Sequence, residues 1–155
     1  MTIKQRQTLM EKLLRQIDTR YSTERAKLKK CWIEENNGKQ MQVFCNGYFI
    51  IMLNEDSMVD VPMGENLGFA KKFFFDMKDD YTFNKMDFSL KEIKAAYKGD
   101  KQFDYGNSRY TTQYFIDCAG IVGKSAVFYQ NENPIKPSYF EGCDGIAVLL
   151  PCKKY

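Results

Sequence analysis

Apolar side chains recur every three or four residues near the start of the chain, which is the period of an amphipathic α-helix. The members of this stripe are Ile3, Met10, Leu13, Leu14, Ile17 and Tyr21. At about 100° per residue, the opposite face collects Lys4, Thr8, Lys12, Arg15 and Thr19. The pattern therefore predicts an N-terminal helix that buries one side and leaves a mostly cationic side exposed.

From residue 26 the apolar period changes to two, which is typical of β-strands. Cys31 and Ile33 alternate with Lys30, Trp32 and Glu34, and we expect Glu34 to face solvent beside a turn. Asn-Gly pairs follow this strand and the next one, and they favour tight hairpin turns. The segments expected as strands are 28–34, 41–45, 48–53, 59–61, 73–75, 125–129, 135–141 and 145–150.

Two further helices are expected in the second half of the chain. Segment 89–98 begins at Ser89 with Glu92 three residues later, which is a capping-box signature, and Gly99 ends it. Segment 111–122 has an apolar side, formed by Tyr114, Phe115, Cys118, Ile121 and Val122. The polar segment 101–108 between these helices is expected to be an ordered loop.

The order of elements is the same at both ends of the chain: a helix and then three strands. A sheet built from hairpins, with one helix in each half, predicts an α+β fold with the helices on one face of antiparallel sheet. No stretch rich in Pro, Gly or Ser divides the chain. We therefore expect a single domain over residues 1–155, with repeated halves of about 1–75 and 76–155.

The chain of 155 residues contains no histidine, which excludes Ser-His-Asp and Cys-His nucleophiles and histidine-bearing zinc sites. It also has no glycine-rich phosphate loop and no nucleophile-elbow motif. Carboxylates gather at Asp76, Asp79, Asp80 and Asp87, but their spacing does not fit a calcium loop. The composition thus argues against an enzyme, and we expect no catalytic residue, metal or cofactor.

The net charge of +3 is too small to indicate a nucleic-acid partner by itself. Its distribution is uneven, because residues 1–30 contain nine basic and three acidic side chains and the remainder is mildly acidic. A cationic helix face beside Thr and Gln suits the DNA phosphate backbone without reading bases. An ordinary solvated face is the alternative interpretation.

The five cysteines are an odd number and form no C-x-x-C pair; they are Cys31, Cys45, Cys118, Cys143 and Cys152. This pattern is typical of free, buried thiols in a reducing compartment. The N-terminus has no apolar core of a signal peptide, and the longest nearly apolar run, 48–53, is too short to span a bilayer. We therefore expect a soluble, cytoplasmic protein without a membrane partner.

Residues 110–129 read YTTQYFIDCAGIVGKSAVFY, and residues 146–154 read IAVLLPCKK. The first segment resembles the last helix and following strand of the bacterial DNA polymerase III β subunit, the sliding clamp. Within it, Tyr114, Ile116, Asp117 and Val122 fall where the family pattern places them. The second segment resembles the closing strands of the clamp. The chain as a whole resembles one clamp domain, most closely the C-terminal one.

This resemblance implies a fold and a function. In a clamp, each domain pairs two helix-and-strand units about a pseudo-two-fold axis, and the helices line a ring around DNA. The implied duplex-DNA contacts are Lys4, Lys12 and Arg15. The implied groove for peptides of polymerases or other clamp-binding proteins includes Leu150, Pro151 and Cys152. The chain would then act without catalysis as a processivity or docking factor in replication, as a homo-oligomer.

Two other hypotheses remain open. The outer face of the second long helix shows Gln113, Asp117 and Gly120, with no basic residue until Lys124. This favours a clamp-fold protein-interaction module that does not bind DNA. A metal-dependent enzyme is the third hypothesis, and it rests only on the acidic segment 76–87.

Overall fold

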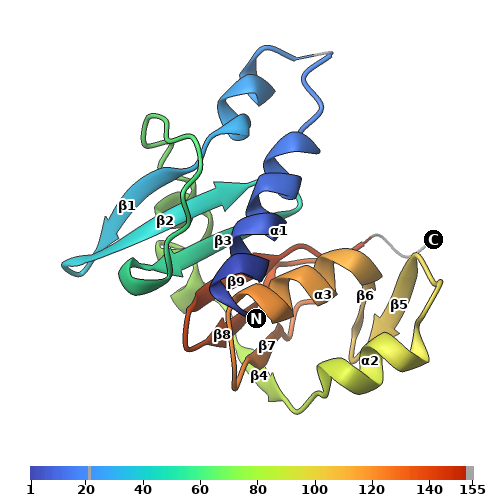
Figure 1. The fold of residues 1–155 in the computed structure, drawn as a ribbon. Coiled ribbons are helices and arrows are strands. Elements are labelled where there is room, and N and C mark those ends of the chain that lie inside the picture. Colours follow the sequence, from blue (N-terminus) through green and yellow to red (C-terminus); the bar gives the residue numbers. More distant parts are fainter. Residues whose placement is uncertain (21, 153–155) are drawn as a thin grey trace.

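The computed structural model describes residues 1–20 and 22–152 (Figure 1). The helices are α1 (Ile3–Arg15), α2 (Leu90–Ala96) and α3 (Thr112–Ile121). Shorter helical turns are η1 (Glu24–Lys29), η2 (Glu55–Ser57), η3 (Lys71–Phe75) and η4 (Lys78–Asp80). The strands are β1 (Trp32–Asn36), β2 (Lys39–Cys45), β3 (Phe49–Asn54), β4 (Phe83–Met86), β5 (Gln102–Tyr105), β6 (Ser108–Thr111), β7 (Val127–Asn131), β8 (Ser138–Gly142) and β9 (Gly145–Leu149).

Seven strands form one sheet in the order β1-β2-β3-β9-β8-β7-β4, and β5 and β6 form a separate hairpin. Every neighbouring pair is antiparallel. At the centre of the sheet, β3 pairs with β9 in a register that runs from Phe49 opposite Leu149 to Leu53 opposite Gly145. This pair joins strands from the two ends of the chain. The predicted α+β class with an antiparallel sheet is therefore confirmed.

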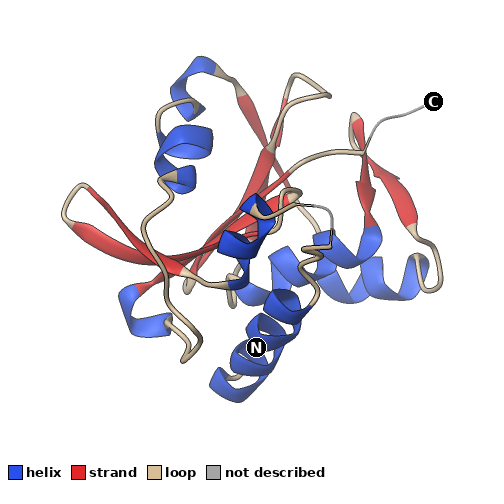
Figure 2. Cartoon of the chain, turned by 90° about the horizontal axis from the view of Figure 1, so that it is seen from above, coloured by secondary structure: helices blue, strands red, loops and turns tan. Residues whose placement is uncertain are grey.

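Helical segments cover both faces of this sheet (Figures 1 and 2). Two adjacent residues of β8 contact helical segments on opposite faces of the sheet. Phe140 packs edge-on against Phe115 of α3, with 4.8 Å between ring centroids. Tyr139 packs edge-on against Phe74 of η3, at 5.0 Å. The helix α1 lies on the α3 side, so the two long helices share one face and η3 lies on the other.

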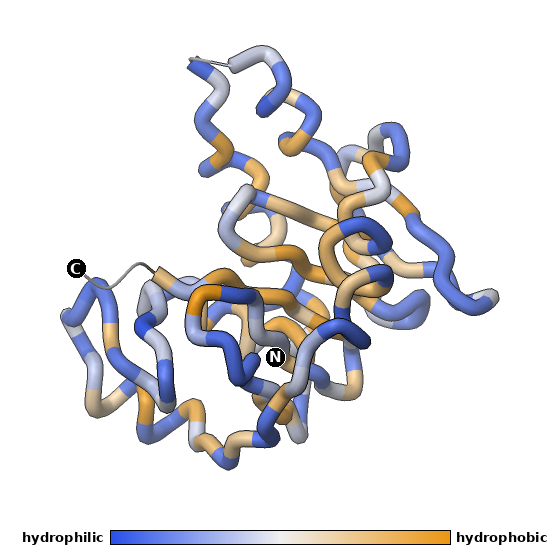
Figure 3. Tube along the Cα trace, turned by 180° about the vertical axis from the view of Figure 1, so that it is seen from behind, coloured by the Kyte–Doolittle hydropathy of each residue, from blue (hydrophilic) through white to orange (hydrophobic). Residues whose placement is uncertain are grey.

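The β1–β2 connection is the tight turn that its Asn-Gly pair predicts. Asn37 and Gly38 both have positive φ angles, of 52° and 79°, as a two-residue turn between right-twisted strands requires. Asn36 and Lys39 are paired across it. The tip projects from the body of the protein and is hydrophilic (Figure 3).

The predicted N-terminal helix is confirmed as α1, although it is shorter than its apolar stripe. It begins with a capping box, in which Thr2 accepts a hydrogen bond from the Gln5 amide and the Gln5 side chain accepts one from the Thr2 amide. Ile17 and Thr19 lie beyond its end, but Ile17 is still buried in the core. Tyr21, the last member of the predicted stripe, lies outside the described residues.

The two helices expected in the second half are confirmed as α2 and α3, but the segment between them is not a loop. It forms the β5–β6 hairpin, in which Phe103 and Tyr110 are buried side chains. Asp104 and Arg109 lie opposite each other on the exposed face and form an ion pair of 2.9 Å. The prediction was wrong because these charges obscure the period-two pattern of the hairpin.

Two other predicted strands are also wrong. The run Phe73-Phe74-Phe75 lies in the π-helical turn η3, where Phe74 is buried and Phe73 is exposed. Residues 59–61 form no strand in the described structure. Instead, the side chain of Gln42 bonds both the amide and the carbonyl of Val59, at 2.8 and 2.9 Å. One side chain thus satisfies backbone groups that a strand partner would otherwise satisfy.

Glu34 is buried, with only 4 % of its surface exposed, which corrects the expectation that it faces solvent. Its carboxylate accepts hydrogen bonds from Trp32 Nε1 at 2.8 Å, from the Ala70 amide at 2.9 Å and from the Lys71 amide at 3.0 Å. These amides start the η3 turn, far along the chain. Glu34 therefore links the edge strand β1 to the segment that covers the second face of the sheet.

The cysteines divide by exposure. Cys31, Cys45 and Cys118 are buried, as predicted, whereas Cys143 is exposed and Cys152 is partly exposed. All five are free thiols. Among the described residues, no helix combines the length and the apolar character needed to cross a membrane.

Candidate nucleic-acid interface and apolar groove

The three predicted DNA contacts lie together on α1. Lys4, Lys12 and Arg15 are all exposed on this helix. The opposite side of α1 is anchored in the core through Met10 and its neighbours Leu13 and Leu14. Within residues 1–20 and 22–152, none of the three cations forms an ion pair. Their charges are therefore available to a ligand.

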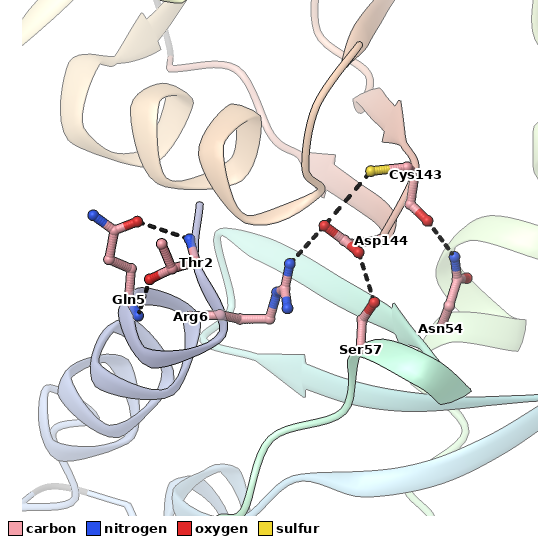
Figure 4. A network of polar contacts seen from close by, with 7 residues as sticks. All are labelled: Thr2, Gln5, Arg6, Asn54, Ser57, Cys143 and Asp144. Carbon is pink, nitrogen blue, oxygen red and sulfur yellow. Dashed lines mark hydrogen bonds and ion pairs between the residues drawn. The ribbon is translucent and has the colours of Figure 1, made fainter.

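Arg6, on the same helix, has a different role (Figure 4). Its side chain is buried, and Nη2 lies 2.5 Å from Asp144 Oδ2 in the turn between β8 and β9. The other oxygen of Asp144 accepts a hydrogen bond from Ser57 Oγ at 2.7 Å. Arg6 therefore holds α1 against the end of the sheet and is not available to contact nucleic acid.

Other basic residues near the N-terminus are also engaged. Arg20 forms an ion pair with Asp18 at 2.9 Å, and Lys27 forms one with Glu24 at 3.5 Å. Arg25 donates hydrogen bonds to the backbone carbonyls of residues 18 and 46. The positive charge of residues 1–30 is therefore divided among pairing within the fold, the exposed face of α1, and Lys29 and Lys30 at the end of η1, which are exposed and form no ion pair among the described residues.

Asp117 is a partly buried residue of α3 and lines a groove together with Lys94 of α2. Its carboxylate accepts a hydrogen bond of 2.8 Å from Gln113. Burial raises the pKa of Asp117, while this hydrogen bond and the charges of Lys12 on α1 and Lys94 on α2 lower it. Leu9 of α1, Lys94 of α2 and Asp117 of α3 line the same groove, so the three helices converge around this carboxylate.

A groove of about 860 Å³ lies between α2 and α3. Three exposed lysines line it: Lys94 and Lys98 from α2 and the segment that follows it, and Lys101 just before β5. None of them forms an ion pair in the described part of the chain. Sequence reasoning missed these residues, although the four-residue spacing of Lys94 and Lys98 places them on one side of a helical turn.

A second groove, of about 520 Å³, is mainly apolar and lies between η3 and the β3–β9 pair. Five of its lining residues are large hydrophobic side chains exposed to solvent: Tyr48, Phe73, Met77, Ile135 and Leu150. They come from four separate stretches of the chain. Lys136 also lines the groove.

The structure separates the three residues that were predicted to line a peptide groove. Leu150 lines the apolar groove, whereas Pro151 and Cys152 are not part of its lining. The Cys152 amide donates a hydrogen bond of 2.7 Å to the Arg109 carbonyl, and its Sγ lies 3.2 Å from Thr111 Oγ1. The chain therefore turns from the groove to the β5–β6 hairpin immediately after Leu150.

The acidic segment does not assemble a metal centre in the described structure. Asp76 forms an ion pair of 2.8 Å with Lys71, and Asp79 and Asp80 are exposed in η4. No group of three or more Cys, Asp or Glu side chains among the described residues is arranged to hold a metal ion.

Compared with protein-family models, curated proteins and solved structures, the chain matches none of them.

Proposed function

We propose that the protein is a non-catalytic, sliding-clamp-like factor that associates with duplex DNA through the face formed by α1, α2 and α3. The observation that carries this proposal is a set of exposed cations on that face without ion-pair partners in the described structure: Lys4, Lys12, Arg15, Lys94, Lys98 and Lys101. Cations on long, flexible side chains contact phosphates without reading base sequence.

The order of the elements supports the clamp-like part of the proposal. The helix α1 precedes β1, β2 and β3, and α3 precedes β7, β8 and β9. In the sheet, β3 and β9 are antiparallel neighbours at the centre. A two-fold axis between these two strands would exchange one set of strands with the other. We propose that this pseudo-two-fold relation is the one found within a clamp domain.

Binding to a duplex oligonucleotide, measured by fluorescence anisotropy at several salt concentrations, tests the DNA-binding function. We expect affinity to fall steeply between about 50 and 200 mM salt. Lys12→Glu and Arg15→Glu should weaken binding several-fold. The matched control is Lys39→Glu, an exposed charge reversal beside the turn of the β1–β2 hairpin. Absence of binding at low salt, or equal affinities for all variants, would contradict the proposal.

The proposal includes a homo-oligomer, partners among polymerases or clamp-binding peptides, and a cytoplasmic location. The five free thiols support a reducing compartment. Size-exclusion chromatography with light scattering tests the assembly, because a ring requires a closed oligomer of defined mass. A monomer at all accessible concentrations would contradict ring formation.

The second candidate is a protein-interaction module that does not bind DNA. It is favoured by the five exposed hydrophobic residues that line the apolar groove, because exposed apolar patches of this kind mark interaction sites. A peptide-display selection tests it. Selected peptides should lose binding to Leu150→Asp and retain binding to Lys39→Glu. This outcome, together with a monomeric protein that binds no DNA at low salt, would favour the module over the clamp.

A further inference from the structure

The apolar groove between η3 and the β3–β9 pair concentrates the exposed hydrophobic surface of the protein. Eight large hydrophobic side chains are exposed in the described part of the chain, and five of them line this groove. The groove also reaches the core, since its lining includes the buried residues Phe49, Ile50 and Val148. An apolar ligand placed here would remove the exposed side chains from water while it packs against the core.

The walls of the groove are held in place by contacts within the fold. Asn46 Oδ1 accepts a hydrogen bond of 2.9 Å from the Tyr48 amide, and the Tyr48 ring stacks on Tyr114 of α3 with 5.5 Å between ring centroids. In the η3 wall, Phe73 packs edge-on against Phe69 at 5.4 Å. A preformed, mainly apolar groove with few polar groups is typical of a small-molecule site, and its volume lies in the usual range of about 300 to 1,000 Å³.

The groove has one charged side chain. Among the described residues, Lys136 is the only cation that lines it, and no carboxylate lines it. Lys136 is partly buried and forms no ion pair within residues 1–20 and 22–152. Its backbone is fixed, because Asn133 accepts hydrogen bonds from the Ile135 amide at 3.2 Å and from the Lys136 amide at 3.1 Å. A lysine on an apolar surface packs its methylene groups there and keeps its ammonium group at the edge.

The acidic residues of the η3–η4 segment do not offset this charge within the groove. Asp76 forms an ion pair of 2.8 Å with Lys71. Asp79 and Asp80 are exposed in η4 and do not line the groove. The lining therefore combines a large apolar surface with a single positive charge, and this combination is complementary to an apolar molecule that carries one negative charge.

We propose that the apolar groove binds a fatty carboxylate, whose hydrocarbon chain packs against the aromatic and aliphatic lining and whose carboxylate pairs with the Lys136 ammonium group. A carboxylate carries the single negative charge that one ammonium group neutralises. This inference goes beyond the proposed association with DNA and does not rest on it. The η3 wall lies on the face of the sheet opposite α1 and α3, which carry the proposed DNA contacts (Figures 1 and 2).

Titration with decanoate below its micelle-forming concentration, followed by two-dimensional amide NMR at constant ionic strength, tests the site. The amides of Tyr48, Phe73 and Leu150 should shift. Lys136→Gln should weaken decanoate about three- to tenfold and leave the affinity for decanol, the uncharged analogue, unchanged. Lys39→Gln, an exposed lysine beside the β1–β2 turn, is the matched control and should have no effect. Absence of decanoate binding, or equal affinities of the wild type and Lys136→Gln for decanoate, would overturn the proposal.

A second variant and a stability measurement separate binding from a detergent effect. Ile135 is 75 % exposed, so Ile135→Glu should fold normally, and it should weaken decanoate more than about tenfold because it brings a negative charge to the groove. Decanoate should raise the unfolding temperature of the wild type, because a ligand that binds only the folded state stabilises it. A fall in the unfolding temperature would mean that decanoate binds the unfolded chain, and it would overturn the proposal.

A parallel titration with duplex DNA and a competition with display-selected peptides separate this inference from the two proposed functions. If decanoate binds and DNA does not, the fatty-carboxylate site stands and the DNA function fails. If DNA binds while decanoate shifts no amide of the groove, this inference fails and the DNA function stands. If a selected peptide binds the groove and decanoate neither binds nor displaces it, the groove is the peptide site of the second candidate function, and this inference fails.

Discussion

Arg6 and Asp144 form an ion pair that ties the first helix of the chain to the turn between its last two strands (Figure 4). The Arg6 side chain is only 5 % exposed and that of Asp144 is 24 % exposed. We expect Arg6→Met to lower the free energy of unfolding by about 2–4 kcal/mol, because it leaves a partly buried carboxylate without its counter-charge. Urea denaturation followed by circular dichroism measures this loss.

The matched control for this prediction is Lys4→Met, which removes an exposed cation from the same helix. It should change stability by no more than about 0.5 kcal/mol. Comparable losses for the two variants would mean that the charge of the helix as a whole, and not the ion pair, contributes the stability.

Glu34→Gln tests the link between β1 and η3. The carboxylate accepts three hydrogen bonds, whereas an amide has one acceptor oxygen and would turn an NH₂ group toward backbone donors. We expect the free energy of unfolding to fall by about 1–3 kcal/mol. Glu35→Gln, at the exposed neighbouring position, should be nearly neutral. If the two variants are equally stable, the buried carboxylate does not hold η3.

Local sequence patterns were sufficient to predict the elements whose stabilising contacts are close in sequence. The helix α1 follows from its own apolar stripe, and the β1–β2 hairpin follows from alternation and from the turn at Asn37 and Gly38. The turn η3 could not be predicted in this way, because its first amides bond to Glu34, 36 and 37 residues earlier. The aromatic run alone suggested a strand.

The same limit applies to the candidate sites. The cations of α1 are visible as one face of a predicted helix. The apolar groove is not, because Phe73, Ile135 and Leu150 meet only when three distant segments fold together.

The cysteines should react in an order set by their burial. Cys143 is exposed, whereas burial raises the pKa of the Cys31 thiol to about 12 and that of Cys118 well above its ordinary value. Because the thiolate is the reactive form, native protein treated with iodoacetamide should be alkylated first at Cys143. Cys31 and Cys118 should react only after unfolding. Peptide mass spectrometry after short labelling times measures the order, and early labelling of Cys31 would contradict the structure.

Asp117 should make stability depend on pH. Burial raises the pKa of its carboxyl group above the ordinary value of 3.8, although the Gln113 hydrogen bond and the charges of Lys12 and Lys94 lower it. The folded state therefore holds this proton to a higher pH than the unfolded state does, so stability is lost as pH rises from 3.8 through the folded pKa. We expect Asp117→Asn to gain stability relative to the wild type above this window and to lose the advantage below it. Denaturation at a series of pH values measures the difference.

A double-mutant cycle with Lys12 identifies the source of this effect. Lys12→Gln removes a charge that favours the ionised carboxylate, so it should raise the pKa of Asp117 further and extend the loss of stability to higher pH. In the Asp117→Asn background, the same lysine substitution should leave the pH dependence unchanged, because no carboxylate remains for it to act on. If Lys12→Gln still changes the pH dependence of stability in that background, the group that titrates is not Asp117. Lys12 of α1 would then not act on the Asp117 carboxylate.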